Sequence, residues 1–199
     1  MKIVLASGSP RRREILSGLG LDFEIAVSDA DEGTVEKNGV PPDIYVQELA
    51  LLKANAVFKH GKYAEKTLII SADTVVVLDG EILGKPSGRD DAFDMLSRLS
   101  GREHSVYTGI CVIDTERAFE ATAVCETRVM FDDADAGRIN AYINTGEPAD
   151  KAGAYGIQGL GALLIKGIKG DYFNVVGLPV KTLADLLKKE FEFDILGGK

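Results

Sequence analysis

The segment Leu68–Leu78 constrains the fold of this chain more than any other feature. It is an almost continuous apolar run, and the pair Asp79-Gly80 that follows is typical of a two-residue hairpin turn, so we expect a buried strand that returns along Glu81–Gly84. One carboxylate, Asp73, interrupts the run. A carboxylate inside a buried strand is costly unless it meets a cation, a metal ion or several hydrogen-bond donors. Asp73 therefore belongs either to a functional site or to a structural ion pair.

The rest of the chain alternates between strand-like and helix-like segments. Apolar runs predict strands at residues 2–6, 23–27, 104–114, 118–131 and 162–168. Amphipathic periodicity and capping residues predict helices at residues 10–19, 42–58, 92–99, 134–144 and 179–191. Hairpins accompany this alternation, so we expect an α/β protein with a mixed sheet. The 199 residues suffice for one large domain or for two lobes that share a core.

Composition narrows the possible partners. A net charge of −8 argues against stable nucleic-acid binding, which needs a basic surface. Residues 1–7 hold an apolar core too short for a signal peptide, and no run is long enough to span a membrane. We therefore expect a cytoplasmic protein without a membrane partner. Cys111 and Cys125 lack metal-ligand spacing and are expected to be reduced core residues, and two histidines are too few for a zinc site or a histidine-based triad.

A cluster of arginines follows the first predicted strand. Ser9 suits the N-cap of the next helix and Pro10 its first position, yet the first turn carries Arg11, Arg12 and Arg13. The positive end of a helix dipole favours carboxylates, so these cations repel one another unless an anion joins them. A helix start with free N–H groups, serines and arginines is a good phosphate site, although the spacing is not that of a P-loop. The alternative is a solvated basic face.

Two lysines occupy positions that need an explanation. Winding residues 43–59 at about 100° per residue places Lys53 in the middle of the apolar arc, where its ammonium must be paired, project into a cleft or snorkel to solvent. The hairpin turn predicts that Thr74 pairs with Lys85. Strict alternation would then place Asp73 on the face opposite Lys85, unless a bulge near Gly84 brings them together.

Two loops carry polar groups that suit ligand binding. The loop at residues 28–33 contains Asp29, Asp31 and Glu32, and carboxylates combined with water and phosphate oxygens are what Mg²⁺ prefers. The glycine-rich loop at residues 153–161 presents Gln158 on a flexible backbone. The alternatives are a solvated acidic loop and an ordinary turn.

Together these segments resemble the Maf family of nucleotide pyrophosphatases. The matching motifs occur in the family's order across nearly the whole chain, at residues 5–12, 52–54, 71–76, 84–86, 99–102, 107–109, 154–159 and 174–179. The resemblance implies a fold similar to that of the inosine-triphosphate pyrophosphatases, with an elongated mixed sheet, flanking helices and a cleft between two lobes. Residues 1–199 would then form a single functional domain.

The resemblance also implies an activity and a set of site residues. Family members hydrolyse nucleoside triphosphates to a monophosphate and pyrophosphate with a divalent metal, Mg²⁺ or Mn²⁺. The family's proton acceptor falls on Asp73. A metal held by Asp73 and Glu32 is our further hypothesis, and whether Asp73 is base, metal ligand or both stays open. The family's acidic metal-site residue falls on Glu32, with Asp31 as the substitute. The phosphate-binding and catalytic positions fall on Ser7, Arg11, Arg12, Lys53 and Lys85.

The sequence Tyr-Gly-Ile-Gln-Gly at residues 155–159 is similar to that of the branch acting on dTTP and UTP. CTP and modified pyrimidine nucleotides are further candidate substrates. The specificity positions would be Arg11, Thr74 and Gln158, because a glutamine amide can match the N3–H and O4 edge of uracil or thymine. Family members are commonly dimers, so we expect a homodimer. Two alternatives stay open: a nucleotide-sensing regulator of septum formation, and a pyrophosphatase for modified purine nucleotides.

Overall fold

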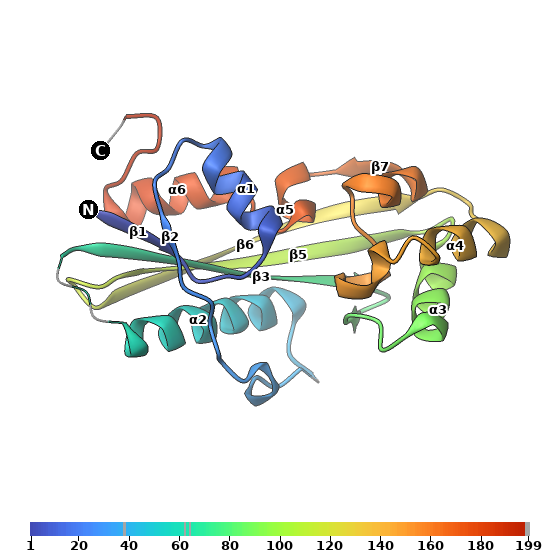
Figure 1. Ribbon diagram of the computed structural model, residues 1–199, viewed down its shortest axis with the longest axis horizontal. Helices are drawn as coiled ribbons and strands as arrows, with labels where there is room; N and C mark the ends of the chain where they lie inside the picture. The colour runs from blue at the N-terminus through green and yellow to red at the C-terminus, as the bar shows by residue number, and fades with distance from the viewer. Residues whose placement is uncertain (38, 62, 64, 198–199) are drawn as a thin grey trace. The chain divides into compact units, whose positions relative to one another are not determined.

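The computed structural model describes residues 1–37, 39–61, 63 and 65–197 (Figure 1). The strands are β1 (Lys2–Leu5), β2 (Glu24–Ile25), β3 (Thr67–Leu78), β4 (Glu81–Leu83), β5 (Glu103–Asp114), β6 (Phe119–Phe131) and β7 (Ile165–Lys169). The α-helices are α1 (Pro10–Gly18), α2 (Pro42–His60), α3 (Arg89–Leu99), α4 (Ala136–Ile143), α5 (Tyr172–Val176) and α6 (Val180–Phe191). The 3₁₀-helices are η1 (Glu32–Thr34), η2 (Glu147–Asp150), η3 (Ala152–Ala154) and η4 (Gly159–Leu164).

The strands form a seven-stranded sheet in the order β2-β1-β3-β5-β6-β7, with β4 paired to β3. β1 is parallel to both β2 and β3, whereas β4 and β7 run antiparallel to their partners. This arrangement confirms the predicted α/β protein with a mixed sheet. The register of β1 on β3 runs from Lys2 opposite Thr67 to Leu5 opposite Ile70.

The backbone divides into two compact units. Unit 1 comprises Met1–Asp73, Thr108–Cys125 and Gly177–Lys199, and unit 2 comprises Thr74–Tyr107 and Glu126–Val176. Strands β3, β5 and β6 each supply residues to both units. Within β3 the boundary falls between Asp73 and Thr74, which are both predicted site residues.

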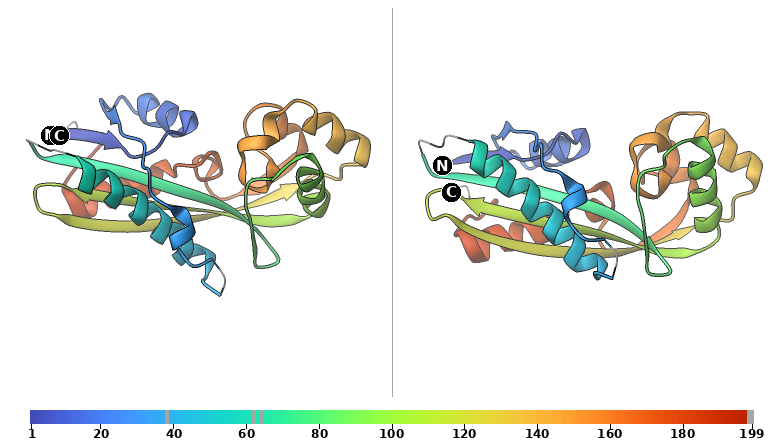
Figure 2. Two further views of the ribbon diagram at one scale, coloured as in Figure 1. Left: turned by 60° about the horizontal axis from the view of Figure 1, so that its bottom comes forward. Right: turned by 90° about the horizontal axis from the view of Figure 1, so that it is seen from below.

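In unit 1, α2 covers one face of the strands, and α1 and α6 lie on the other face (Figures 1 and 2). The core beneath α2 contains Val4, Ala6, Ala50, Ala54, Val57, Ile69, Cys111 and Ile113. Two local features hold α2 close to the sheet. The buried Ser71 hydroxyl donates to the Ala50 carbonyl at 2.5 Å, and a Cβ at Gly109 would lie only 2.4 Å from the Val46 backbone. Alternation along β3 consequently turns Ile69, Ser71 and Asp73 toward α2.

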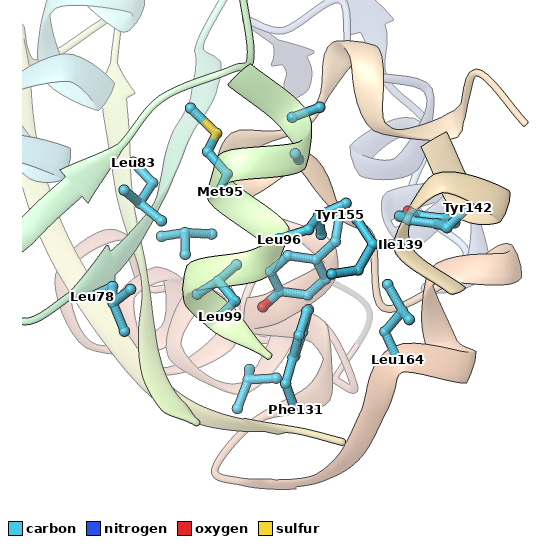
Figure 3. Packing of buried hydrophobic residues seen from close by; sticks show 14 of the residues in the cluster. Leu78, Leu83, Met95, Leu96, Leu99, Phe131, Ile139, Tyr142, Tyr155 and Leu164 are labelled. Atoms are coloured by element: carbon cyan, nitrogen blue, oxygen red, sulfur yellow. The ribbon is translucent and has the colours of Figure 1, made fainter. Parts of the chain in front are cut away.

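The core of unit 2 surrounds α3 and α4 (Figure 3). The buried face of α3 consists of the four residues that the sequence predicted, Ala92, Met95, Leu96 and Leu99. Tyr155, from the glycine-rich segment, inserts its ring beside Phe131 in this core. The loop that carries Gln158 is therefore anchored by an aromatic side chain next to it in sequence.

Several local predictions were wrong in detail. The strand expected at residues 162–168 begins only at Ile165, because the N–H groups of Leu160 and Gly161 bind the Glu147 carboxylate and η4 forms instead. The short helix α5 was not predicted. Cys111 is buried as expected, but Cys125 is only half-buried. Ser9 occupies the predicted N-cap position without capping through its side chain.

In the part of the chain that the structure describes, no helix combines the length and apolar character that a bilayer crossing requires.

Candidate active site

Three predicted site residues of unit 1 meet in one cluster. The Lys53 Nζ atom lies 2.5 Å from Asp73 Oδ1 and 3.0 Å from Glu32 Oε1. The Lys53 and Asp73 side chains are 15% and 13% exposed, whereas Glu32 is 56% exposed. The ammonium on the apolar arc of α2 is thus neutralised by pairing, as the sequence required. Both interpretations of Asp73 predict this contact: a site residue would be paired with a cation, and so would half of a structural ion pair.

The cluster depends on how α2 lies against β3. Ser71 contacts Ala50, and Asp73, two residues further along the strand, contacts Lys53 three residues further along the helix. α2 runs opposite to β3 (Figure 1), and side chains of a helix point toward its N-terminus, so Lys53 reaches back along α2 to Asp73. The length of the Lys53 side chain thus bridges the helix and the strand. The close approach of Gly109 to α2 keeps the helix against the sheet.

The acidic loop presents one carboxylate to this cluster and uses another to shape its own turn. Asp31 is the N-cap of η1, and its Oδ1 accepts a hydrogen bond from the Gly33 N–H at 3.0 Å. Glu32 is the residue that reaches Lys53. The geometry therefore favours Glu32 over Asp31 as the second carboxylate of the site.

Within the arginine cluster at the start of α1, Arg12 donates hydrogen bonds to two neutral oxygens. Arg12 Nε donates to the Gly177 carbonyl at 2.8 Å, and its Nη1 donates to Ser7 Oγ at 3.2 Å. Ser7 Oγ also accepts from the Ser9 N–H at 3.2 Å, which leaves the serine O–H proton to be donated to a ligand oxygen. These contacts fix one guanidinium beside the exposed start of a helix, as a phosphate site needs.

Electrostatics connect Arg12 with the carboxylate cluster. Burial lowers the pKa of Arg12, the charges of Asp73 and Glu32 oppose that shift, and the neighbouring Arg11 adds to it. Arg12 therefore interacts electrostatically with both carboxylates and with a second arginine. The predicted cationic and anionic groups of unit 1 thus lie within electrostatic range of one another.

Sequence reasoning missed one residue of this neighbourhood. Tyr45, on the first turns of α2, is half-buried, and its pKa is raised by burial and then by the negative charges of Asp73 and Glu32. Its position on the apolar arc gave no signal, because a tyrosine there is indistinguishable from an ordinary core residue. Only the packing of α2 places it near the carboxylates.

In unit 2 the hairpin turn forms as predicted, but the pairing does not extend to Lys85. Asp79 and Gly80 have φ values of 52° and 81°, as a type I′ turn requires, and Leu78 pairs with Glu81. The ladder ends where Val76 pairs with Leu83, so the predicted Thr74–Lys85 pair was wrong. Gly84 and Pro86 flank Lys85, and both residue types weaken a strand. The Gly84 carbonyl accepts from the Gly153 N–H at 2.9 Å.

This same contact joins the segments of two predicted site residues in unit 2. Gly84 directly precedes Lys85, and Gly153 begins the glycine-rich loop of Gln158. The side chains of Lys85 and Gln158 are both exposed, and that of Thr74 is half-buried. Unit 2 therefore brings the Lys85 segment to the start of the Gln158 loop.

The carboxylates of unit 1 suit a divalent ion only in combination with other ligands. Among the described residues, no group of three or more His, Cys, Asp or Glu side chains could hold a metal ion. Asp73 and Glu32 nevertheless converge on one cation, the Lys53 ammonium. Mg²⁺ is commonly held by one or two carboxylates plus phosphate oxygens and water. The residues present therefore fit a metal ion whose coordination a phosphate ligand completes.

Comparison with known proteins relates the whole chain to one family. The sequence profile described as "Maf-like protein" matches residues 2–190. A dTTP/UTP pyrophosphatase of Thermoanaerobacter sp. (strain X514) is 51% identical over 196 residues, covering 98% of this chain and 100% of that protein. The dTTP/UTP pyrophosphatase of Clostridium novyi (strain NT) is 51% identical over 183 residues, or 92% and 94% of the two chains. That of Moorella thermoacetica is 50% identical over 186 residues, or 94% and 93%.

Proposed function

Because this chain belongs to the Maf family, we propose that it hydrolyses dTTP and UTP to the nucleoside monophosphate and pyrophosphate. Full-length relatives at about 50% identity that carry this name support the proposal. The structural observation that carries it is the convergence of Asp73 and Glu32 on Lys53, within electrostatic range of Arg12. Such a cluster combines a proton acceptor, cations for phosphate and two oxygen ligands for a metal ion.

The cationic groups would hold and neutralise the triphosphate. Ser7 and Arg12 bind phosphate oxygens at the start of α1, with Arg12 oriented in advance by the Gly177 carbonyl. Arg11 adds a second guanidinium at the same helix start. Lys53 and Lys85 stabilise the charge that develops on the departing pyrophosphate. Charge stabilisation and positioning of this kind dominate phosphoryl transfer in general.

Asp73 would act on the attacking water. Its carboxylate accepts the water proton as the oxygen attacks the α-phosphorus and the bond to the oxygen bridging to the β-phosphorus breaks. A divalent ion held by Asp73, Glu32 and the triphosphate would supply a water of lowered pKa and charge neutralisation. Lys53 holds Oδ1 of Asp73 and so limits the rotation of the carboxylate. In this proposal Asp73 is both metal ligand and base.

The base would be selected at the specificity positions that the family resemblance implies. The Gln158 amide offers one acceptor and two donors, which match the N3–H and O4 of uracil and thymine. Thr74 and Arg11 are the other specificity positions. A purine presents a different edge and leaves part of the amide unpaired, which costs affinity when water is excluded.

A substrate panel tests the proposal. The purified chain is given dTTP, UTP, CTP and GTP at matched Mg²⁺ concentration, and the products are separated and quantified. We expect nucleoside monophosphate and pyrophosphate, with dTTP and UTP preferred. Nucleoside diphosphate with orthophosphate would show that a different bond is cut. Equal rates with GTP and UTP would contradict the role of Gln158, and nucleotide binding without pyrophosphate release would favour the regulatory alternative.

A further inference from the structure

Two side chains outside the proposed active site close the loop that presents Gln158. The Tyr142 hydroxyl, on α4, accepts from the Gly156 N–H at 3.3 Å and donates to Glu147 Oε1 at 2.9 Å. The Glu147 carboxylate, at the start of η2, accepts from the N–H groups of Leu160 and Gly161, both at 3.0 Å. One tyrosine–glutamate pair thus holds the backbone on both sides of the loop.

The glycines of the loop fit this closure. A Cβ at Gly161 would lie 2.2 Å from the Gly156 carbonyl oxygen and 2.7 Å from the Tyr142 hydroxyl, so the two ends of the loop touch through bare backbone. Gly159 has a φ of 69°, and a Cβ there would lie 2.8 Å from Glu147 Oε2. A side chain at either position would push the carboxylate or the hydroxyl away. These two glycines are therefore explained by the Tyr142–Glu147 pair.

The pair is built into the protein rather than lying loosely on its surface. Tyr142 is 6% exposed and belongs to the core of unit 2 (Figure 3), and Glu147 is half-buried. Burial pushes the pKa of Glu147 upward, but the hydrogen bonds from Gly161, Leu160 and Tyr142 outweigh it, and the net pKa lies below its ordinary value. Burial and the bond to Glu147 raise the pKa of Tyr142. The contact is thus a charge-assisted O–H to carboxylate bond, one of the stronger kinds.

A second anchor fixes the residue just before the loop. Tyr155 is 5% exposed, its ring stacks edge-on against Phe131 with centroids 4.7 Å apart, and its hydroxyl lies 2.7 Å from His104 Nε2. The chain is therefore held up to Tyr155 by the core and from Leu160 onward by Glu147. Between these anchors the exposed Gln158 forms the tip of the loop.

We propose that Tyr142 and Glu147 are positioning residues for base selection, because they clamp residues 156–161 and so fix the direction of the Gln158 amide. This inference rests on the proposed function, in which Gln158 reads the base. It assigns a purpose to side chains that contact neither phosphate nor metal in that mechanism.

The physical reason lies in the cost of ordering a glycine-rich loop. Three of the six residues at 156–161 are glycines, which have the largest conformational freedom to lose. Without the clamp, the loop would have to be ordered each time a nucleotide binds, and the amide could turn to accept or donate toward a wrong base. With the clamp, this ordering is complete before binding, which is the general advantage of a preorganised site.

Two conservative substitutions test the clamp, each with a matched control in unit 2. Glu147→Gln keeps the shape but replaces one acceptor oxygen with an NH₂ group, and Tyr142→Phe removes the hydroxyl alone. The controls are Glu103→Gln, at an exposed carboxylate on β5, and Tyr172→Phe, at an exposed tyrosine on α5. Thermal unfolding of every variant verifies that it folds. Tyr142→Phe, which adds no new polar group, provides the test if Glu147→Gln does not fold.

Selectivity and loop order are measured together. We expect each clamp variant to lower the ratio of kcat/KM for UTP over GTP roughly threefold to tenfold, the effect of losing one positioned hydrogen bond. Amide hydrogen exchange at residues 156–161 of the nucleotide-free protein should accelerate in the same variants. Neither control should change the ratio or the exchange. In a Gln158→Ala background, Glu147→Gln should have no further effect on the ratio, because the group that it positions is gone.

The outcomes separate this inference from the function on which it rests. If Gln158→Ala lowers the ratio but neither clamp variant does, the clamp is overturned and the role of Gln158 stands. Equal loss of activity on all nucleotides in the clamp variants also overturns it. If Gln158→Ala leaves the ratio unchanged, the base-reading assignment itself fails, and the clamp's role in selection fails with it.

Discussion

The two units place their functional side chains by different physical means. In unit 1, Lys53 and Asp73 stand on a long helix and a long strand, and their charges meet because the helix packs closely on the strands. In unit 2, Gln158 stands on a loop whose direction is set by a tyrosine hydroxyl, a carboxylate and backbone N–H groups. The first arrangement depends on close packing of regular elements, and the second depends on hydrogen bonds to a chain with little regular structure.

The difference suits the two tasks that we propose. Handling a triphosphate needs charged groups at fixed distances, and regular elements hold charges more firmly than loops do. Reading a base needs a neutral amide at an exposed tip, where a loop can reach. Substitutions in unit 1 should therefore alter catalysis or packing strongly, whereas substitutions near the loop should act mainly on selectivity.

The largest effect is expected at Asp73. Asp73→Asn keeps the shape of the side chain but removes the carboxylate that accepts the proton, so kcat for dTTP and UTP should fall about 1,000-fold. Pyrophosphate release measures the loss, and circular dichroism with thermal unfolding verifies that the fold is intact. Near-normal turnover in a folded variant would reduce Asp73 to a structural partner of Lys53.

The buried histidine of unit 2 should make stability depend on pH. Burial lowers the pKa of His104 from 6.5 to about 4. Between these values the unfolded chain binds a proton that the folded chain does not, so stability is complete above pH 6.5 and is lost as the pH falls toward 4. The difference corresponds to about 3 kcal/mol.

Chemical unfolding of wild type and His104→Gln between pH 4 and 8 isolates this contribution from that of the carboxylates. The free energy of unfolding of wild type should decrease more steeply below pH 6.5 than that of the variant. Parallel pH profiles would show that His104 does not titrate in this range.

The packing of α2 in unit 1 can be tested at Gly109. Gly109→Ala places a methyl group 2.4 Å from the Val46 backbone, so α2 must move away from the sheet. We expect a loss of about 2 kcal/mol in the free energy of unfolding, together with a lower kcat because Lys53 moves with the helix.

Gly18→Ala is the matched control, because a Cβ at Gly18 meets nothing within 4 Å. It should change stability by no more than about 1 kcal/mol and leave kcat unchanged. Equal behaviour of the two alanine variants would contradict the close approach at Gly109.

The smallest effect separates the two carboxylates of the acidic loop. Glu32→Gln should raise the Mg²⁺ concentration needed for half-maximal activity about tenfold, because one charged oxygen ligand is lost. Asp31→Asn should leave it unchanged, since asparagine also serves as an N-cap of η1. Activity measured against Mg²⁺ concentration for both variants tests this prediction. An effect of Asp31→Asn alone would make Asp31, and not Glu32, the second carboxylate of the site.

Much of the fold could be predicted from local sequence. The apolar run that became β3, the type I′ turn at Asp79-Gly80 and the buried face of α3 all follow from rules that involve neighbouring residues only. The errors occurred where a distant partner competes with local preference. Glu147 turned residues 159–164 into η4, and the hairpin ladder ended at Leu83, before Gly84 and Pro86.

The residues of the candidate site likewise fall into those that the sequence could identify and those that it could not. Asp73 and Lys53 were conspicuous because each is a charge among apolar residues, and such a charge needs a partner whatever the fold. Tyr45, Tyr142 and Glu147 gave no such signal, because a tyrosine on an apolar face and a glutamate beside a loop are ordinary.

The sequence by itself determined the mixed α/β architecture, the buried carboxylate, the misplaced lysine and the arginines at a helix start, because each follows from burial costs and local periodicity. Only the tertiary structure decided that Lys53 pairs with Asp73, that Glu32 and not Asp31 joins them, and that a tyrosine and a glutamate close the Gln158 loop. These contacts join residues whose distance in space depends on how helices, strands and loops pack. Local sequence preferences carry no information about that distance.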